Sequence, residues 1–230
     1  NQQAAFLRDR ELGRALARMF TAYLTEELQH YREQGDGAPA SVTTRLMRLT
    51  VDGKLLTDVE IVSIVRNWTA GVGTVAAGIG ILLLHLATRQ DLQQRLRAEP
   101  SVLPQAVDEI LRVDGPLVAN RRTTTREVEI DGRQIGQGQR ISLMWIPADR
   151  DPRAFDDPED VRLDRNEQGT VLFGDGIHYC QGAPLARLQM RIALEELLRQ
   201  SRHIELSGAE PPSRVTFPSN GMLTLSLRIS

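Results

Sequence analysis

The sequence has little cysteine, few aromatic residues and almost no net charge. Its 230 residues include one cysteine, Cys180, and only 4% are aromatic. A single cysteine excludes a disulfide within the chain and makes the reducing cytoplasm the expected location. The formal net charge is -2, so no excess of positive charge is available for nucleic acid or an anionic membrane. We therefore expect neither nucleic acid nor a membrane as a partner.

Charge is also missing from one long stretch, because residues 67–88 contain no Asp, Glu, Lys or Arg. The stretch is long enough to span a bilayer. Gly73 and Ala77 have the spacing of small residues that membrane helices use for packing. No aromatic residue anchors the C-terminal end of the stretch. A buried helix in the centre of a soluble domain is therefore the preferred interpretation.

Hydrophobic periodicity predicts a mainly helical fold with small antiparallel β-sheets. The helices are expected over residues 11–32, 41–49, 57–87, 91–99, 102–113 and 182–200. Thr57 and Glu60 have the capping-box spacing that starts a helix. Short strands are expected on both sides of the Asp131-Gly132 turn. Residues 149–164 show no apolar periodicity, so this segment is predicted to be irregular.

A C-terminal hairpin is expected around Asn220-Gly221, a dipeptide typical of two-residue turns. Alternating apolar residues follow it, and they are Leu223, Leu225, Leu227 and Ile229. The alternation predicts a strand after the turn.

The most unusual residues surround Cys180, in the run Phe173-Gly-Asp-Gly-Ile-His-Tyr-Cys-Gln-Gly182. Gly174 and Gly176 predict a tight loop whose backbone can approach another group closely. Cys180 precedes a predicted helix, whose positive N-terminal end favours a thiolate. A structural zinc site would need about four ligands, and His178 is the one histidine nearby. From the residues alone, a Cys-His nucleophile and a buried cysteine that only packs remain open.

The string Phe-Gly-x-Gly-x-His-x-Cys-x-Gly, with Leu185-Ala186-Arg187 after it, resembles the haem-binding loop of the cytochrome P450 family. The resemblance implies haem b (iron protoporphyrin IX) as cofactor and Cys180 as the thiolate ligand of its iron. It implies that His178 lies at a haem propionate and that Phe173 packs against the ring. Gly174 shapes the loop, and Gly182 with the helix N–H groups is expected to hydrogen-bond the sulfur.

Two further motifs of the same family occur in order. Glu109-Ile110-Leu111-Arg112 resembles its Glu-x-x-Arg motif, whose ion pair is structural. Arg150, in the irregular segment, is expected to join this pair. Arg122 matches the arginine that binds a haem propionate, although the adjacent Arg121 leaves that assignment open by one residue.

Ala70-Gly71-Val72-Gly73-Thr74 resembles the helix that crosses the distal side of the haem. The resemblance implies that Gly71 allows close approach and a local widening of the helix. It also implies that Thr74 holds dioxygen or a water on the proton path. Gly73 stands where the family usually has Asp or Glu, which puts the usual proton route in doubt. Residues 66–74 also look like the distal helix of reductase-fused members.

The same glycines allow a second interpretation, because Gly71-x-Gly73-x-x-Ala76 has the spacing of a dinucleotide-binding loop. That interpretation needs a strand over residues 61–65, whereas the capping box predicts a helix there.

The resemblance covers residues 1–230 as one haem-thiolate domain, with the N-terminal half of the family's domain absent. It implies a monooxygenase that inserts one oxygen atom from O₂ into a small organic substrate. Electrons would come from a separate ferredoxin or flavoprotein. The missing acid at Gly73 motivates a peroxide-using or non-oxygenase enzyme as an alternative. The missing half motivates a non-catalytic haem-binding module.

Overall fold

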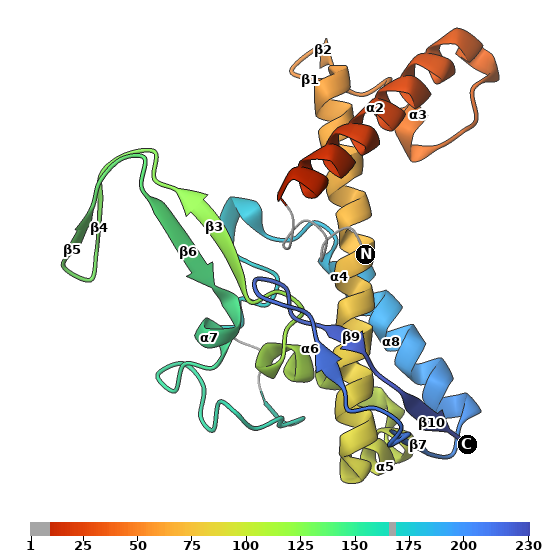
Figure 1. Cartoon of the computed structure of the whole chain (residues 1–230), viewed down its shortest axis with the longest axis vertical. Coiled ribbons are helices and arrows are strands. Elements are labelled where there is room, and N and C mark those ends of the chain that lie inside the picture. Colours follow the sequence, from red (N-terminus) through yellow and green to blue (C-terminus); the bar gives the residue numbers. More distant parts are fainter. Residues whose placement is uncertain (1–9, 166–168) are drawn as a thin grey trace. The chain divides into compact units, whose positions relative to one another are not determined.

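The computed structural model describes residues 10–165 and 169–230. Contacts divide the chain into two compact units, Asn1–Gly73 and Thr74–Ser230 (Figure 1). One long helix, α4 (Asp58–Thr88), contributes residues to both units. The single haem-thiolate domain expected over residues 1–230 remains a prediction.

The first unit consists of helices with one small hairpin. Its elements are α2 (Arg10–Gln34), η1 (Gly35–Gly37), α3 (Val42–Leu46), β1 (Thr50–Val51), β2 (Lys54–Leu55) and the first part of α4. Leu28, Ile61 and Val62 form its buried core. The predicted capping box is present, because the Thr57 amide donates to Glu60 Oε2 at 2.7 Å and the Glu60 amide donates to Thr57 Oγ1 at 3.3 Å.

Helix α4 is α-helical without interruption from Asp58 to Thr88. A strand over residues 61–65 is therefore excluded, and the dinucleotide-binding interpretation fails with it. Within the described part of the chain, α4 is the one helix long and apolar enough to cross a membrane, and 28% of its most apolar window is buried. Ile81, Leu82 and Leu86 are fully buried, whereas Trp68 and Val72 are exposed. The interpretation as a buried core helix thus fits the C-terminal part of α4 and not the stretch before it.

The second unit packs three helices around the C-terminal part of α4. They are α5 (Gln90–Ala98), α6 (Leu103–Val113) and α8 (Ala183–Gln200). Their apolar faces share one core that includes Leu96, Val107, Ile110 and Leu194. Helix α6 is buried at every position from Ala106 to Val113, including its charged residues. The unit also contains η2 (Pro100–Val102), α7 (Trp145–Asp149) and η3 (Gly176–His178).

Four antiparallel strand pairs lie in the described part of the second unit. They are β3 (Ala119–Thr123) with β6 (Arg140–Met144), β4 (Val128–Ile130) with β5 (Arg133–Ile135), β7 (Ile204–Leu206) with β10 (Leu227–Ile229), and β8 (Ser213–Arg214) with β9 (Met222–Thr224). Figure 1 shows the β4–β5 hairpin extending from the β3–β6 pair. The predicted turn at Asp131-Gly132 is confirmed, since both residues have positive φ, 50° and 73°.

The predicted C-terminal hairpin is present as β8 and β9, but its turn is longer and its second strand shorter than expected. The chain after Asn220-Gly221 forms two short strands in different sheets, because β9 pairs with β8 while β10 pairs with β7. The connection is also longer than a two-residue turn, since the Val215 amide donates to the Gly221 carbonyl at 3.1 Å. Local alternation cannot reveal such a change of partner, because the partner strand lies elsewhere in the chain.

Gly221 packs tightly against α4. A Cβ atom at Gly221 would lie 2.8 Å from the Cβ of Ala77, and one at Gly80 would lie 3.3 Å from Met222 Cγ. A side chain at Gly221 therefore requires the β8–β9 connection to move away from the helix.

We predict that Gly221→Ala lowers the free energy of unfolding by about 1–3 kcal/mol, as overpacking typically does. Gly136→Ala is the matched control, because a Cβ there would meet only the Gln139 side chain at 3.7 Å. Urea denaturation of both variants measures the difference. Equal urea midpoints for the two variants would show that the β8–β9 connection can move away from α4 without loss of stability.

Candidate functional site

Residues 173–182 form a tight loop directly before α8. The Cys180 amide donates to the Phe173 carbonyl at 2.9 Å, and the Tyr179 amide donates to the Gly176 carbonyl at 3.1 Å. Gly174 and Gly176 have φ values of +77° and +62°, which residues with a Cβ adopt only at a cost. These bonds and conformations fix the backbone before the cysteine, and the Ala183 amide, which donates to the Cys180 carbonyl at 3.2 Å, fixes the backbone after it.

The Cys180 side chain is exposed at the start of α8. This exposure excludes a buried cysteine that only packs. A Cβ added to Gly182 would lie 3.8 Å from the sulfur, so Gly182 keeps the space beside the sulfur open. Within residues 10–165 and 169–230, no group of three or more His, Cys, Asp or Glu side chains could hold a metal ion. A structural zinc site with four protein ligands is thereby excluded for this part of the chain.

The loop brings together five of the residues predicted to hold the cofactor: Phe173, Gly174, His178, Cys180 and Gly182. His178 ends η3 and is exposed. Phe173 and Gly174 lie at the other end of the loop. A Cβ at Gly174 would lie 3.4 Å from the His178 carbonyl, so a glycine here lets the two ends of the loop approach.

Arg122 is not joined to this loop by any hydrogen bond or ion pair that the described part of the chain contains. It lies on β3, partly buried, and donates to the Arg121 carbonyl at 2.9 Å. Its role at a haem propionate remains a prediction, as does the choice between Arg121 and Arg122.

Gly71, Gly73 and Thr74 all lie on α4, with the boundary between the two units after Gly73. The local widening expected at Gly71 is absent, because every residue of α4 has α-helical hydrogen bonding. A Cβ at Gly71 or Gly73 would meet nothing within 4 Å. The structure therefore contains no close contact that requires glycine at either position.

The Glu109–Arg112 pair is buried, as the motif predicts. Arg112 Nε donates to Glu109 Oε2 at 2.8 Å, and the two side chains are 3% and 7% exposed. Arg112 also donates to the carbonyls of Asp149 and Pro158 at 2.6 and 2.8 Å. Its guanidinium lies 5.0 Å from the centre of the Phe155 ring. The pair thus fixes the irregular segment against α6.

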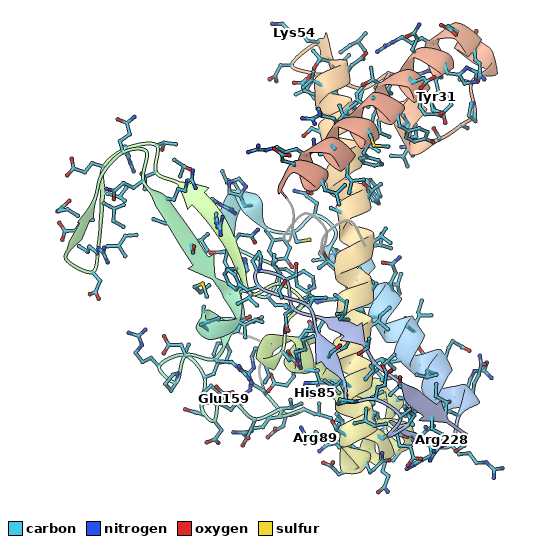
Figure 2. All side chains as sticks on the ribbon, in the orientation of Figure 1. Tyr31, Lys54, His85, Arg89, Glu159 and Arg228 are labelled. Carbon is cyan, nitrogen blue, oxygen red and sulfur yellow. The ribbon has the colours of Figure 1, made fainter. Side chains whose placement is uncertain are left out.

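The third arginine of this network is Arg165, and the prediction of Arg150 was wrong. Arg165 Nε donates to Glu109 Oε1 at 2.8 Å. Arg150 instead pairs at 2.9 Å with Glu159, an exposed residue of the irregular segment (labelled in Figure 2). Burial acts to raise the pKa of Glu109. Hydrogen bonds from Arg112, the Arg162 amide and Arg165 outweigh that effect and hold the pKa below its usual range.

A second buried acid, Asp149, connects this network to the cysteine loop. Its carboxylate accepts from the Val171 amide at 2.7 Å and from Thr170 Oγ1 at 3.2 Å. The Val171 carbonyl in turn accepts from the Gly174 amide at 2.8 Å. Burial raises the pKa of Asp149 although these two donors act to lower it. The chain entering the loop is therefore attached to α7 and, through the Asp149 carbonyl, to Arg112.

A third buried acid, Asp108, was not predicted from the sequence, and it pairs with Arg187 of α8. Arg187 Nε lies 2.9 and 2.7 Å from the two carboxylate oxygens of Asp108. The Arg187 guanidinium also lies 4.4 Å from the centre of the Phe173 ring, and its Nη1 lies 3.3 Å from Tyr179 Oη. Two features of the sequence could have indicated this pair. Asp108 directly precedes the Glu-x-x-Arg motif, and Arg187 follows shortly after Cys180.

Asp114, at the end of α6, binds three donors from distant segments. They are His85 of α4 (labelled in Figure 2), Arg214 of β8 and Asn220, at 3.2, 2.6 and 2.7 Å. Burial acts to raise the pKa of Asp114, but these hydrogen bonds outweigh it and hold the pKa far below its usual range. The same residues line a pocket of about 590 Å³ with Val118 and Ile146. No residue of the cysteine loop lines this pocket.

Comparison with known proteins identifies the chain. Residues 7–229 match the family described as Cytochrome P450. The chain belongs to this family. The motif around Cys180 and the buried Glu109–Arg112 pair are therefore features of a member of the cytochrome P450 family. The family implies haem as cofactor.

Two curated bacterial relatives are enzymes. The chain is 34% identical over 180 residues to the cyclomarin C epoxidase of Salinispora arenicola, covering 78% of the chain and 46% of the epoxidase. It is 34% identical over 187 residues to the beta-dihydromenaquinone-9 omega-hydroxylase of Mycobacterium bovis, covering 81% of the chain and 38% of the hydroxylase. The chain thus spans less than half the length of these relatives.

The solved structure of a hydroxylase shows the same fold. The hydroxylase HmtN of himastatin biosynthesis superimposes with a TM-score of 0.85 at 31% identity, over 98% of the chain and 61% of that structure. The mainly helical fold with small antiparallel sheets is confirmed. The similarity of residues 66–74 to reductase-fused members is not supported by these comparisons.

We predict that Arg165→Ala lowers the free energy of unfolding by about 2–4 kcal/mol, because it removes one cation from the buried Glu109 carboxylate. Arg150→Ala is the matched control and should cost less than about 1 kcal/mol, since its partner Glu159 is exposed. Chemical denaturation of the two variants under identical conditions gives the comparison. A larger loss of stability in Arg150→Ala than in Arg165→Ala would show that Arg150 is the third arginine of the network.

Proposed function

We propose that the whole protein is a haem-thiolate monooxygenase that inserts one oxygen atom from O₂ into a small organic substrate. The observation that carries the proposal is the exposed Cys180 thiol on a fixed loop at the start of α8. Its epoxidase and hydroxylase relatives support the same class of reaction. We expect electrons from a separate ferredoxin or flavoprotein, and a cytoplasmic location.

The residues present fit haem. One protein thiolate is enough to hold a haem iron, and the loop would offer it the single accessible thiol of Cys180. The space kept open by Gly182 and the exposure of Cys180 leave the sulfur free to bind. When bound, haem supplies an iron centre at which O₂ is reduced and its O–O bond cleaved.

The chain's own residues have separate roles in this proposal. Cys180 donates the thiolate, and the N-terminal end of α8 favours that charged form. Gly182 and the N–H groups at the start of α8 act as hydrogen-bond donors to the sulfur. His178 and Arg122 bind the propionates, Phe173 packs beside the ring, and Gly174 closes the loop. Thr74 and the neighbouring Gly71 and Gly73 contribute from α4, where Thr74 holds dioxygen or a water.

The test is the absorption spectrum of the reduced, CO-bound protein, which separates a thiolate-ligated haem from other ligation. A haem-loaded protein without a thiolate-type spectrum would contradict the proposal. Product formation with redox partners and NAD(P)H, compared with peroxide alone, then separates the monooxygenase from the peroxide-using alternative. Absence of product under both conditions would favour a non-catalytic haem-binding module.

We predict that Cys180→Ser abolishes the thiolate-type spectrum and leaves the helical content unchanged, since the side chain is exposed and its backbone bonds remain. Circular dichroism measures the helical content, and the CO difference spectrum measures the ligation. Ile177→Ala is the control, because it changes an almost fully exposed side chain of the same loop and keeps the thiol. A thiolate-type spectrum in Cys180→Ser would contradict the assignment.

The proton supply gives a further prediction, which depends on Gly73. Positioned proton transfer is worth typically about 10²–10⁴-fold in rate, and Gly73 offers no carboxylate beside Thr74. We therefore expect turnover driven by O₂ to form little product per reducing equivalent. Peroxide-driven turnover, which brings its own protons, should suffer less.

Gly73→Asp should raise the product formed per reducing equivalent and leave the peroxide-driven rate nearly unchanged. Val72→Asp is the matched control, since it places the same carboxylate at an exposed position of the same helix, two residues from Thr74, where the two side chains do not face each other. A tightly coupled wild-type enzyme whose coupling falls in Gly73→Asp would show that Gly73 belongs to a different proton route.

A further inference from the structure

The buried pair of Asp108 and Arg187 lies between α6 and the cysteine loop. Asp108 belongs to α6, and its side chain is 7% exposed, whereas that of Arg187 on α8 is 35% exposed. Burial raises the pKa of Asp108 although Arg187 acts to lower it. A carboxylate in this position is destabilised unless a cation stays beside it. Asp108 therefore holds the Arg187 guanidinium in place.

The held guanidinium contacts the cysteine loop at two points. Its carbon lies 4.4 Å from the centre of the Phe173 ring, within the range of a cation–π interaction. Its Nη1 lies 3.3 Å from the Tyr179 hydroxyl, which can accept a hydrogen bond. Phe173 supplies the carbonyl that binds the Cys180 amide, and Tyr179 is the residue before Cys180. Arg187 thus contacts residues on either side of the hydrogen bond that fixes the cysteine.

We propose that Asp108 and Arg187 act as one positioning unit that sets the geometry of the Cys180 thiol. Asp108 immobilises the guanidinium, and the guanidinium immobilises Phe173 and Tyr179. The importance of this geometry for iron ligation rests on the proposed function, whereas its effect on the loop does not. The hydrogen bonds and ion pairs of Asp108 and Arg187 within the described residues do not include the sulfur, so both residues act through the loop.

The direct test is amide hydrogen exchange at Cys180 and Tyr179 in the 230-residue chain without haem. Arg187→Gln and Asp108→Asn should each accelerate exchange of these two amides by at least about 10-fold, as expected on losing hydrogen bonds to charged groups. Arg187→Lys keeps a cation but lacks the planar fork, so we expect an intermediate effect. This conservative variant also decides the question if Arg187→Gln does not fold.

The matched control is Arg191→Gln, one turn further along α8, whose partner Glu195 is exposed. It should leave the exchange of both loop amides unchanged. The double variant Asp108→Asn/Arg187→Gln should exchange no faster than the faster single variant if the two residues act as a unit. Unchanged exchange in Arg187→Lys and Asp108→Asn, or fully additive effects in the double variant, would overturn the proposal.

A spectroscopic measurement separates positioning from simple stability. The measured quantity is the fraction of bound haem that gives a thiolate-type CO spectrum in haem-loaded protein. We expect Arg187→Lys to lower this fraction at least about two-fold, because misplacement of the sulfur weakens ligation. The urea midpoint of the variant should stay unchanged. A normal fraction in this variant would count against positioning of the thiol. If the wild-type protein itself lacked that spectrum, the proposed function would fail. The exchange measurements would still decide the role of the pair.

Discussion

The second unit depends on the pairing of three carboxylates of α6 and its C-terminal end, two of them buried and one partly buried. Asp108, Glu109 and Asp114 all lie at this helix, and each would be costly to bury without compensating donors. The donors come from different parts of the chain. Asp108 binds α8, Glu109 binds the irregular segment, and Asp114 binds α4, β8 and the β8–β9 connection. Apolar packing brings the helices together without direction, whereas these pairs require particular side chains at particular places.

Two of these carboxylates reach the cysteine loop by separate routes. Glu109 holds Arg112, which binds the Asp149 carbonyl, and the Asp149 carboxylate binds the chain just before Phe173. Asp108 holds Arg187, which contacts the loop at Phe173 and Tyr179. An exposed thiol therefore sits on a backbone that is attached from both sides. Such support is what a metal ligand needs to keep its geometry, because the side chains around it are themselves fixed.

The local features of this fold could be predicted from the sequence, and the features that depend on distant contacts could not. The capping box at Thr57, the turn at Asp131-Gly132 and the loop around Cys180 are encoded within a few residues, and all three predictions hold. The prediction of Arg150 in place of Arg165 failed because the irregular segment has no periodicity from which to judge which arginine returns to α6. The C-terminal strand was extended too far because its two halves have different partners.

The two parts of the predicted site are constrained to different degrees, and this difference decides how substitutions should act. The cysteine loop is fixed by bonds among residues 108–187, all within the second unit, so changes there act first on structure. A Cβ at Gly71 or Gly73 would have no neighbour within 4 Å, so the first atom of a new side chain there meets no close contact with the described residues. A carboxylate introduced at Gly73 can therefore report on proton supply without first disturbing the fold. Substitutions of Asp108 or Arg187 must instead be separated from loss of stability, for which a charge-conserving variant is needed.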